Sequence, residues 1–362
     1  MTFINKVVIA HGSLDHAFSR NALDRVREGF PDIVIEKNNY PCGLNDSGMG
    51  KDTLHFLPYK GEFLKPCPGT KEYICCGYNI LNTGTNCPLD CSYCILQSYI
   101  NIPNLRVFAN LEEELGNVLN FFDSHTDSIF RVGTGEFTDS LAIDPITFCS
   151  DLLIPEFSKR KNVILELKTK TINIKRVLAS KSRDRIVVSW SLNSPYISSR
   201  EEIRAPGIKD RLEAARKCQS EGFVLGFHFD PLIIHPGWKD GYLKTLDLMD
   251  KYIDPKGIIW ISLGSFRYMP ALKRIVRKRH PGTIILDGEF IQGLDGKMRY
   301  FKPIRIDIYS FMKEHLNEWH PNLGLYLCME SDDVWHESIG WSPGNSQGLK
   351  EYLDARTIEL FG

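Results

Sequence analysis

The chain has 362 residues, of which 43% are hydrophobic and 25% are charged, and its formal net charge is −1. This composition is normal for a globular protein with a sizeable core, and no apolar run is long enough for a transmembrane helix, so we expect no membrane partner. The near-zero charge excludes a polyelectrolyte that binds nucleic acid over its whole surface, so a nucleic-acid partner would need a local basic face.

The N-terminal part, residues 1–70, predicts a small α/β unit. Strands are expected at 6–10 and 32–36, with an amphipathic helix at 20–30 between them. Polar residues follow the first strand at once, which favours a strand over a signal peptide, so we expect a cytoplasmic protein with reduced cysteines. Residues 37–68 are rich in Asn, Gly, Pro and Lys and predict a loop-rich connector.

Strands and helices alternate over residues 71–281. The expected strands are 78–81, 128–132, 163–168, 185–191, 223–229 and 257–263, and the expected helices are 91–100, 111–124, 147–159, 172–180, 208–221, 242–252 and 271–280. Strands that are apolar throughout and alternate with helices predict a parallel sheet covered on both faces. Such units are too few here to close an eight-stranded barrel. We therefore expect an α/β fold with a partial (βα)6 barrel, open on one side, whose functional residues lie at the C-terminal ends of the strands.

The remaining residues, 282–362, predict an extension that packs on the barrel. It is expected to contain a strand at 284–286, a turn at 293–296, a helix at 306–319 and a strand at 323–328.

Three cysteines form the strongest motif of the chain. Cys87, Cys91 and Cys94 follow the pattern Cys-x3-Cys-x2-Cys. Three thiolates leave one iron of a four-iron cluster without a protein ligand, and such an iron is open to a small molecule. A structural zinc with a distant fourth ligand, or three unrelated core cysteines, are the alternatives.

With Tyr93 just before the third cysteine, the motif resembles the signature of the radical S-adenosylmethionine (SAM) superfamily. In that superfamily the open iron chelates SAM, and one electron cleaves SAM to methionine and a 5′-deoxyadenosyl radical. The resemblance implies a 4Fe-4S cluster and SAM as cofactors, together with a reductant such as flavodoxin or ferredoxin.

Polar residues lie at the expected strand ends. Glu136 follows the second strand and could receive the α-ammonium of SAM or hold substrate, with a solvated surface role as the alternative. Lys168 and Lys170 end the third strand, where alternation turns one of them inward unless both are surface charges. Ser191 and Asn193 end the fourth strand and carry groups suited to ribose hydroxyls.

Further candidates follow in the second half of the barrel. His228 and Asp230 end the fifth strand and are candidate catalytic residues, although a lone His in an apolar strand is often a core residue. Residues 267–280 form a basic amphipathic segment, which is either a solvated face or a contact to DNA phosphates. Arg299 and Tyr300 follow a turn, where an Arg beside a Tyr can hold a phosphate and stack on a base.

The resemblance extends beyond the cysteines. It covers Ile95-Leu96-Gln97, Leu167-Lys168-Thr169-Lys170, Ser191-Leu192-Asn193-Ser194, residues 210–217, Gly237-Trp238 with Gly241-Tyr242, and residues 267–274. These stretches resemble the spore photoproduct lyase family of radical SAM enzymes, which split a thymine–thymine lesion in DNA. The resemblance implies that Lys170, Ser191 and Asn193 bind SAM, that Tyr93 lies beside the adenine, that Thr138 lies near SAM, and that Arg299 contacts the lesion backbone. Arg267, in front of the basic segment, is a further candidate for substrate binding.

The chain departs from this family at two positions. Glu136 stands where the family has a cysteine that returns a hydrogen atom to the product, and Ile95 stands where the family has a tyrosine. Another thiol (Cys149, Cys218 or Cys328) could take over, or the product could differ.

The resulting hypothesis is a radical SAM carbon–carbon lyase acting on a thymine lesion or modified base in DNA, as a monomer or weak dimer. One alternative is a radical SAM enzyme that modifies a peptide, nucleoside or small molecule. The other is a non-catalytic iron–sulfur protein that binds nucleic acid.

Overall fold

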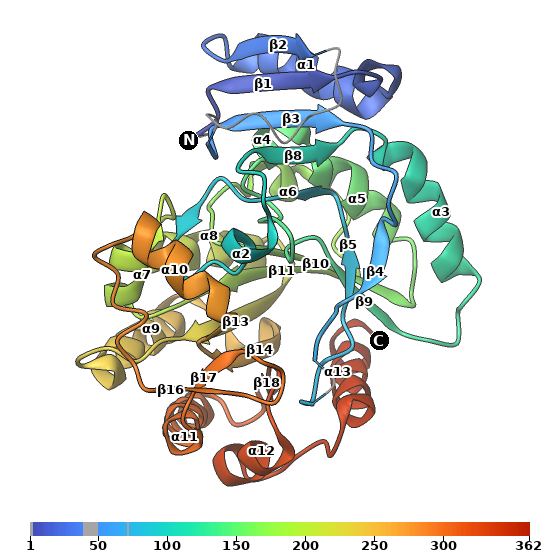
Figure 1. The fold of residues 1–362 in the computed structure, drawn as a ribbon. Helices are drawn as coiled ribbons and strands as arrows, with labels where there is room; N and C mark the ends of the chain where they lie inside the picture. The colour runs from blue at the N-terminus through green and yellow to red at the C-terminus, as the bar shows by residue number, and fades with distance from the viewer. Residues whose placement is uncertain (1–2, 39–49, 71) are drawn as a thin grey trace. The chain divides into compact units, whose positions relative to one another are not determined.

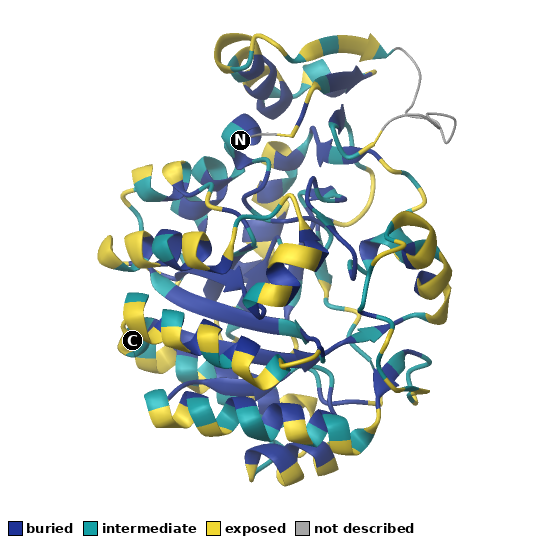
Figure 2. Ribbon diagram, turned by 90° about the vertical axis from the view of Figure 1, so that its left-hand side faces the viewer, coloured by how far each residue is buried: buried dark blue, intermediate teal, exposed yellow. Residues whose placement is uncertain are grey.

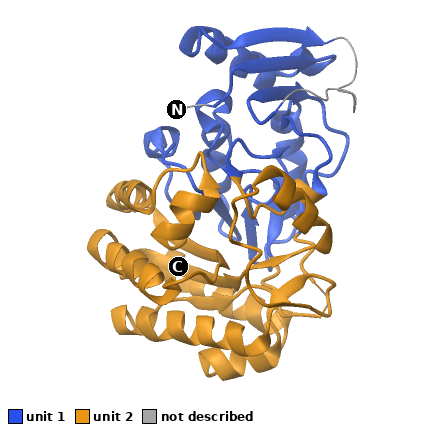
Figure 3. Cartoon of the chain, turned by 60° about the vertical axis from the view of Figure 1, so that its left-hand side comes forward, with its two compact units in different colours: residues 1–66, 78–90, 99–186 blue, residues 67–77, 91–98, 187–362 orange. Residues whose placement is uncertain are grey.

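The computed structural model describes residues 3–38, 50–70 and 72–362. Its contacts divide the chain into two compact units (Figure 3). Unit 1 comprises residues 1–66, 78–90 and 99–186, and unit 2 comprises residues 67–77, 91–98 and 187–362. The domain boundaries expected at residues 70 and 281 stay a prediction.

The N-terminal part of unit 1 is a five-stranded sheet in the order β2-β1-β3-β8-β6 (Figure 1). Its strands are β1 (Lys6–Ala10), β2 (Val34–Asn38), β3 (Thr53–Leu57), β6 (Gly84–Thr85) and β8 (Leu105–Phe108), with η1 (Ser13–Asp15) and α1 (Ala17–Gly29) between β1 and β2. The expected strands at 6–10 and 32–36 and the helix between them are confirmed within a few residues.

The loop-rich connector expected at 37–68 is wrong over its second half. β3 and β4 (Leu64–Pro66) lie inside it, while residues 39–49 lie outside the described residues. β3 is buried because it pairs in parallel with β1 on one side and with β8 on the other. The sequence analysis missed β3 because its short apolar run is flanked by turn-forming residues, and the pairing with β1 and β8 cannot be read from local periodicity.

The remaining strands of unit 1 are β4, β5 (Asn79–Leu81), β9 (Phe130–Gly133) and β10 (Val163–Thr169), which pair in that order. The β5–β9 and β9–β10 pairs are parallel. The helices of this unit are α3 (Leu111–Asp123), α4 (Asp144–Thr147), α5 (Cys149–Phe157) and α6 (Lys175–Ala179). β10 is apolar and buried over most of its length, as expected of a strand covered on both faces.

The strands β11 (Ile186–Ser191), β13 (Val224–Leu232), β14 (Ile258–Ser265) and β18 (Leu325–Leu327) form the parallel sheet of unit 2. The helices between and around them are α7 (Pro195–Glu201), α8 (Ile208–Ser220), α9 (Trp238–Tyr252) and α10 (Pro270–Arg279), with short segments η2 (Pro255–Gly257) and β12 (Glu202–Ile203). Figure 2 shows buried strands beside helices whose outer faces are exposed. Parallel strands place their carboxyl ends at one edge, which is where the candidate residues of this unit lie.

The C-terminal residues of unit 2 add a small antiparallel sheet in the order β15-β17-β16 and three helices. The elements are β15 (Arg267–Tyr268), β16 (Phe290–Gln292), β17 (Met298–Tyr300), α11 (Lys302–Trp319), α12 (Asp332–Ile339) and α13 (Ser346–Phe361). The strand expected at 284–286 is wrong, because these residues form a turn in which Asp287 N–H donates to the Ile284 carbonyl and Ile285 is buried. The helices α12 and α13 had no counterpart in the sequence prediction.

β7 (Asp90–Cys91) lies within the cysteine motif, and the short helix α2 (Leu96–Tyr99) follows it. None of the helices in the described ranges combines the length and apolarity needed to cross a bilayer.

Asp144 in unit 1 predicts a pH-dependent stability. Its side chain is buried at the start of α4 and accepts hydrogen bonds from Ser150 N–H (2.8 Å) and Ser150 Oγ (2.6 Å). Burial raises the pKa of Asp144 from 3.8 to about 6, against the opposing effect of the Ser150 hydrogen bonds. The folded state therefore holds this proton more tightly than the unfolded state, and stability rises as the pH falls from about 6 to about 4.

We expect this group to contribute about 3 kcal/mol across that pH window. Asp144→Asn should flatten the pH dependence of the free energy of unfolding, measured by urea denaturation between pH 4 and 7. An unchanged slope in the variant would contradict the assignment.

Candidate functional site

The three motif cysteines are thiols rather than disulfides. Cys91 and Cys94 belong to unit 2, where Cys94 N–H donates to the Cys91 carbonyl (3.2 Å), and Cys87 belongs to unit 1. In the ranges that the structure describes, no three His, Cys, Asp or Glu side chains are grouped as a metal site, so ligation by Cys87, Cys91 and Cys94 stays a prediction. The residue types themselves fit a 4Fe-4S cluster with one open iron, because three cysteines that are close in sequence would supply three of its four ligands.

Residues 91–98 of unit 2, which we call the cysteine loop, are held by the carboxylates of Glu201 and Glu202. Ser92 N–H donates to the Glu201 carbonyl (2.8 Å), and Ser92 Oγ donates to the Glu201 side chain. Tyr93 O–H donates to Glu202 Oε1, and both side chains are buried. Burial, followed by the Glu202 charge, raises the pKa of Tyr93 well above its usual value, so this hydroxyl stays a donor.

The candidate residues of unit 1 lie where β9 and β10 end. Lys168 Nζ lies 3.5 Å from Glu136 Oε2, and both side chains are partly exposed. Gly135 lets the two strand ends approach, because a Cβ there would lie 2.9 Å from Lys168 Cβ and 3.1 Å from the Lys168 carbonyl. Glu136 is thus paired with a cation, and its catalytic role stays a prediction.

Asp139 is a residue of this region that the sequence analysis missed. Its buried carboxylate accepts hydrogen bonds from Thr169 Oγ1 (2.7 Å) and from Lys170 N–H (2.7 Å), and two further backbone N–H groups of its own loop bind it. Asp139 therefore joins two segments: its own loop, which contains Thr138, and the end of β10, which Lys170 follows. An acidic residue just after a strand end was the available signal, but the partner that it binds is distant in sequence.

Asp139→Ala is expected to lower the free energy of unfolding by about 2–4 kcal/mol, because several buried donors lose their acceptor. Asp139→Asn keeps one oxygen acceptor and should lose less. Chemical denaturation of the three proteins measures this difference. Equal stability of wild type and Asp139→Ala would show that Asp139 does not fix the two segments.

A small pocket in unit 1 is lined in part by Thr138, Asp139 and Cys149. Burial raises the pKa of the Cys149 thiol, so it stays protonated. Of the other two thiols considered as hydrogen donors, Cys218 lies buried in α8 and Cys328 follows β18.

The end of β11 in unit 2 carries Ser191 and Asn193, both of them buried. Asn193 Nδ2 donates to the Pro231 carbonyl (2.9 Å), and Asn193 Oδ1 accepts from Tyr242 O–H (2.7 Å). The amide of Asn193 thus ties the ends of β11 and β13 together, and the predicted SAM contacts of Ser191 and Asn193 stay predictions.

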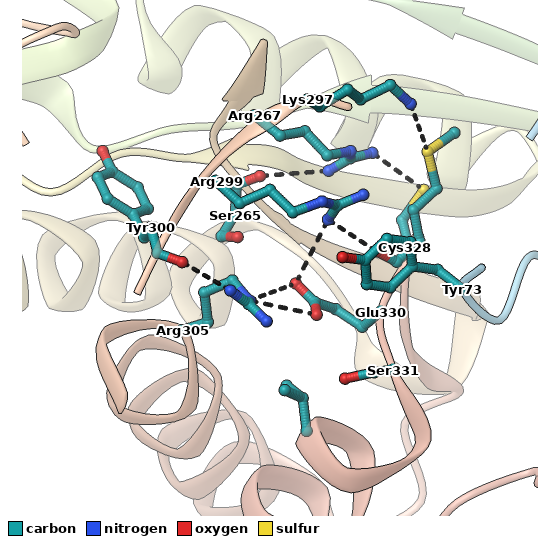
Figure 4. A network of polar contacts seen from close by, with 12 residues as sticks. Tyr73, Ser265, Arg267, Lys297, Arg299, Tyr300, Arg305, Cys328, Glu330 and Ser331 are labelled. Atoms are coloured by element: carbon teal, nitrogen blue, oxygen red, sulfur yellow. Dashed lines mark hydrogen bonds and ion pairs between the residues drawn. The ribbon is translucent and has the colours of Figure 1, made fainter. Parts of the chain in front are cut away.

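Asp230 near the end of β13 and Arg267 on β15 form a bidentate pair. Arg267 Nη1 lies 3.1 Å from Asp230 Oδ1, and Arg267 Nη2 lies 3.1 Å from Asp230 Oδ2. The same guanidinium donates to Cys328 Sγ at 3.4 Å (Figure 4). His228 lies two residues before Asp230 on β13 and is nearly buried. The structure therefore brings Asp230, Arg267 and Cys328 together, and the roles predicted for His228, Asp230 and Arg267 stay untested.

Arg299 and Tyr300 lie on β17 with buried side chains. Arg299 Nη2 lies 2.7 Å from Asp295 Oδ2, and Nη1 donates to the Met329 carbonyl (3.0 Å). The guanidinium stacks 4.0 Å from the centre of the Tyr73 ring, and both side chains are labelled in Figure 4. Tyr300 stacks on Phe290. Both side chains are bound within unit 2, and a direct contact of either with substrate stays a prediction.

The basic segment expected at 267–280 is the helix α10 with Arg267 in front of it. Its exposed cations are Lys273, Arg274, Arg277, Lys278 and Arg279. Arg279 Nη1 donates to Gln97 Oε1 (2.5 Å), and Gln97 Nε2 donates to the Cys91 carbonyl (3.1 Å). The basic face therefore adjoins the cysteine loop.

The family model described as spore photoproduct lyase matches residues 74–323, which is well over half of the chain. The chain belongs to the spore photoproduct lyase family. The spore photoproduct lyase of Bacillus subtilis (strain 168) is 27% identical over 248 residues, which cover 67% of this chain and 70% of that protein. The enzyme of Clostridium acetobutylicum is 22% identical over 325 residues, which cover 86% and 95%.

Solved structures of the spore photoproduct lyase family share the fold. A spore photoproduct lyase variant with bound AdoMet and dinucleoside spore photoproduct superimposes with a TM-score of 0.77 at 21% identity, covering 91% of this chain and 99% of that one. The predicted α/β fold with a partial radical SAM barrel is confirmed. Membership also confirms the predicted family, and with it an enzyme of the lyase class with a 4Fe-4S cluster and SAM as the family's cofactors.

Proposed function

We propose that this chain is a radical SAM lyase that reverses a thymine lesion of the spore photoproduct type in DNA. The observation that carries the proposal is the family match over residues 74–323, which includes the cysteine motif. The fold match to a spore photoproduct lyase with bound AdoMet and dinucleoside lesion supports it.

The residues proposed to bind the cofactors form two groups. Cys87, Cys91 and Cys94 would hold the cluster, which with SAM supplies the radical that abstracts hydrogen from substrate. Tyr93, Thr138, Lys170, Ser191 and Asn193 would hold SAM. Hydrogen bonds fix the Tyr93 hydroxyl, the Lys170 backbone and the Asn193 amide, which suits the orientation of a reactive group.

The proposed substrate contacts divide by exposure. The cations of α10 are exposed and suited to DNA phosphates, whereas Arg267, Arg299 and Tyr300 are held inside unit 2. Asp230, His228 and Glu136 are proposed to act on the lesion or on protons near it. Location in the cytoplasm, a flavodoxin or ferredoxin as reductant, and a monomeric or weakly dimeric state belong to the same proposal.

The experiment that tests this function is anaerobic. The protein is reconstituted with iron and sulfide, reduced and given SAM, and 5′-deoxyadenosine is measured with and without DNA that carries the lesion. We expect the DNA to stimulate SAM cleavage and the lesion to disappear. SAM cleavage that DNA does not affect would favour a radical SAM enzyme of another substrate, and the absence of SAM cleavage would favour a non-catalytic iron–sulfur protein.

One observation favours a radical SAM enzyme that acts on another substrate. Glu136 stands at the hydrogen-donor position of the family and pairs with Lys168 at 3.5 Å, and a carboxyl O–H is too strong a bond to give hydrogen to a carbon radical. A lesion-dependent product that differs from two restored thymines would identify an altered reaction.

A further inference from the structure

A buried ion pair is hydrogen-bonded to the cysteine loop. Arg211 in α8 and Glu202 in β12 have side chains that are 0% and 1% exposed, and Arg211 Nη2 lies 2.5 Å from Glu202 Oε2. The other oxygen of Glu202 accepts the hydroxyl proton of Tyr93, which lies between Cys91 and Cys94. One carboxylate thus joins a buried cation to the loop that carries two cluster cysteines.

The same guanidinium reaches the end of β11. Arg211 Nη1 donates to the Ser191 carbonyl (3.0 Å), and Arg211 Nε donates to the Pro206 carbonyl (2.9 Å). Ser191 is one of the residues proposed to bind SAM. The chain Tyr93–Glu202–Arg211–Ser191 therefore links, through buried hydrogen bonds, the loop of the cluster to the strand end of the SAM site.

We propose that Glu202 and Arg211 are positioning residues that set the geometry of the cysteine loop against the SAM site and balance one negative with one positive charge beside the cluster. The proposal rests on the radical SAM cofactors of the proposed function, and it does not depend on the DNA substrate.

The physical reason is that a charge pair is costly to bury and is tolerated when its hydrogen bonds are satisfied. In water-excluded surroundings a single unbalanced charge acts strongly on a neighbouring redox centre. A hydrogen-bonded partner behind a metal ligand also fixes the ligand's orientation, and its removal typically weakens metal affinity or activity about 10- to 100-fold.

Two variants separate the electrostatic effect of Glu202 on the cluster from its effect on the position of the cysteine loop. Glu202→Gln keeps the shape but leaves Arg211 as an unbalanced positive charge, which favours the reduced and more negative cluster. We expect its reduction potential to shift to a more positive value. Tyr93→Phe leaves the Arg211–Glu202 pair intact, so we expect little change in the reduction potential. We expect about tenfold weaker SAM binding, because the cysteine loop loses its hydrogen bond to Glu202.

The matched control is Glu213→Gln on the exposed side of α8. Glu213 pairs with Lys209 at 3.7 Å, and the side chains of Lys209 and Glu213 are 63% and 43% exposed, so the same loss of one charge is screened by water. This variant should keep the wild-type potential and SAM affinity.

The measurements are the cluster potential, the electron paramagnetic resonance spectrum with and without SAM, the dissociation constant for SAM, and the thermal unfolding of the apoprotein. If Glu202→Gln fails to fold, Tyr93→Phe still decides the positioning role. The proposal is overturned if Tyr93→Phe binds SAM as wild type does, or if Glu213→Gln shifts the potential as much as Glu202→Gln. Failure of lesion reversal by the wild-type protein would refute the DNA function alone, because none of these measurements uses DNA.

Discussion

Cys94→Ala is expected to reduce SAM cleavage to background and to prevent assembly of a full four-iron cluster. A cluster needs thiolate ligands, and with two of the three motif cysteines left, a second iron would lack a protein ligand. The backbone turn from Cys91 to Cys94 is unaffected by the change, since it is made by main-chain atoms. Iron and sulfide per chain after anaerobic reconstitution, together with the yield of 5′-deoxyadenosine, measure the effect.

Cys218→Ala is the matched control, because Cys218 is a buried thiol in α8 and not part of the motif. It should retain iron and SAM cleavage. Full iron content and normal SAM cleavage in Cys94→Ala would refute the cluster assignment and return the motif to the zinc or core alternatives.

Glu330→Ala is expected to lower the free energy of unfolding by about 3–5 kcal/mol. Glu330 is fully buried, accepts a hydrogen bond from Tyr309 O–H (2.9 Å), and pairs with Arg305 at 3.2 Å (Figure 4). The backbone carbonyl of Glu330 also accepts from Ile74 N–H (2.9 Å). Removing the carboxylate leaves a buried guanidinium without its counter-ion, which is the most costly kind of polar truncation.

The control for this prediction is Glu337→Ala on α12. Glu337 pairs with Lys302 at 2.7 Å, but its side chain is about half exposed, so its loss should cost less than about 1 kcal/mol. Urea denaturation of both variants gives the comparison. A loss below 1 kcal/mol in Glu330→Ala would show that the Arg305–Glu330 pair contributes little net stability.

The alternation of apolar strands with helices was sufficient to predict the six barrel strands, whereas the helix expected at 91–100 is wrong outside Leu96–Tyr99. The predicted strand 185–191 and β11 agree within one residue, and the predicted helix 208–221 and α8 do so as well. The prediction failed where burial comes from distant partners: β3 is a strand because β1 and β8 flank it, and Ile285 is buried in a turn. Local periodicity carries no information about such neighbours.

The candidate site also combines features that the sequence predicts with features that only the fold reveals. Cys87, Cys91 and Cys94 lie within one short segment, so their spacing is a local property, and the sequence alone was enough to predict them as cluster ligands. The hydrogen bonds of Asp139 with Thr169 and of Glu202 with Tyr93 join residues that are far apart in the chain, so only the tertiary structure reveals them.

The sequence by itself determined the family, the order of the six expected barrel strands, and the cysteine motif, because each depends on patterns within short segments of the chain. Only the tertiary structure decided which charged side chains are paired with an opposite charge. Arg299 is in sequence a basic residue beside a turn, and in the fold it is buried against Asp295 and Tyr73. Whether a charged side chain faces solvent, substrate or a partner depends on packing between distant segments, because burying a charge is tolerated only where the fold supplies its counter-charge.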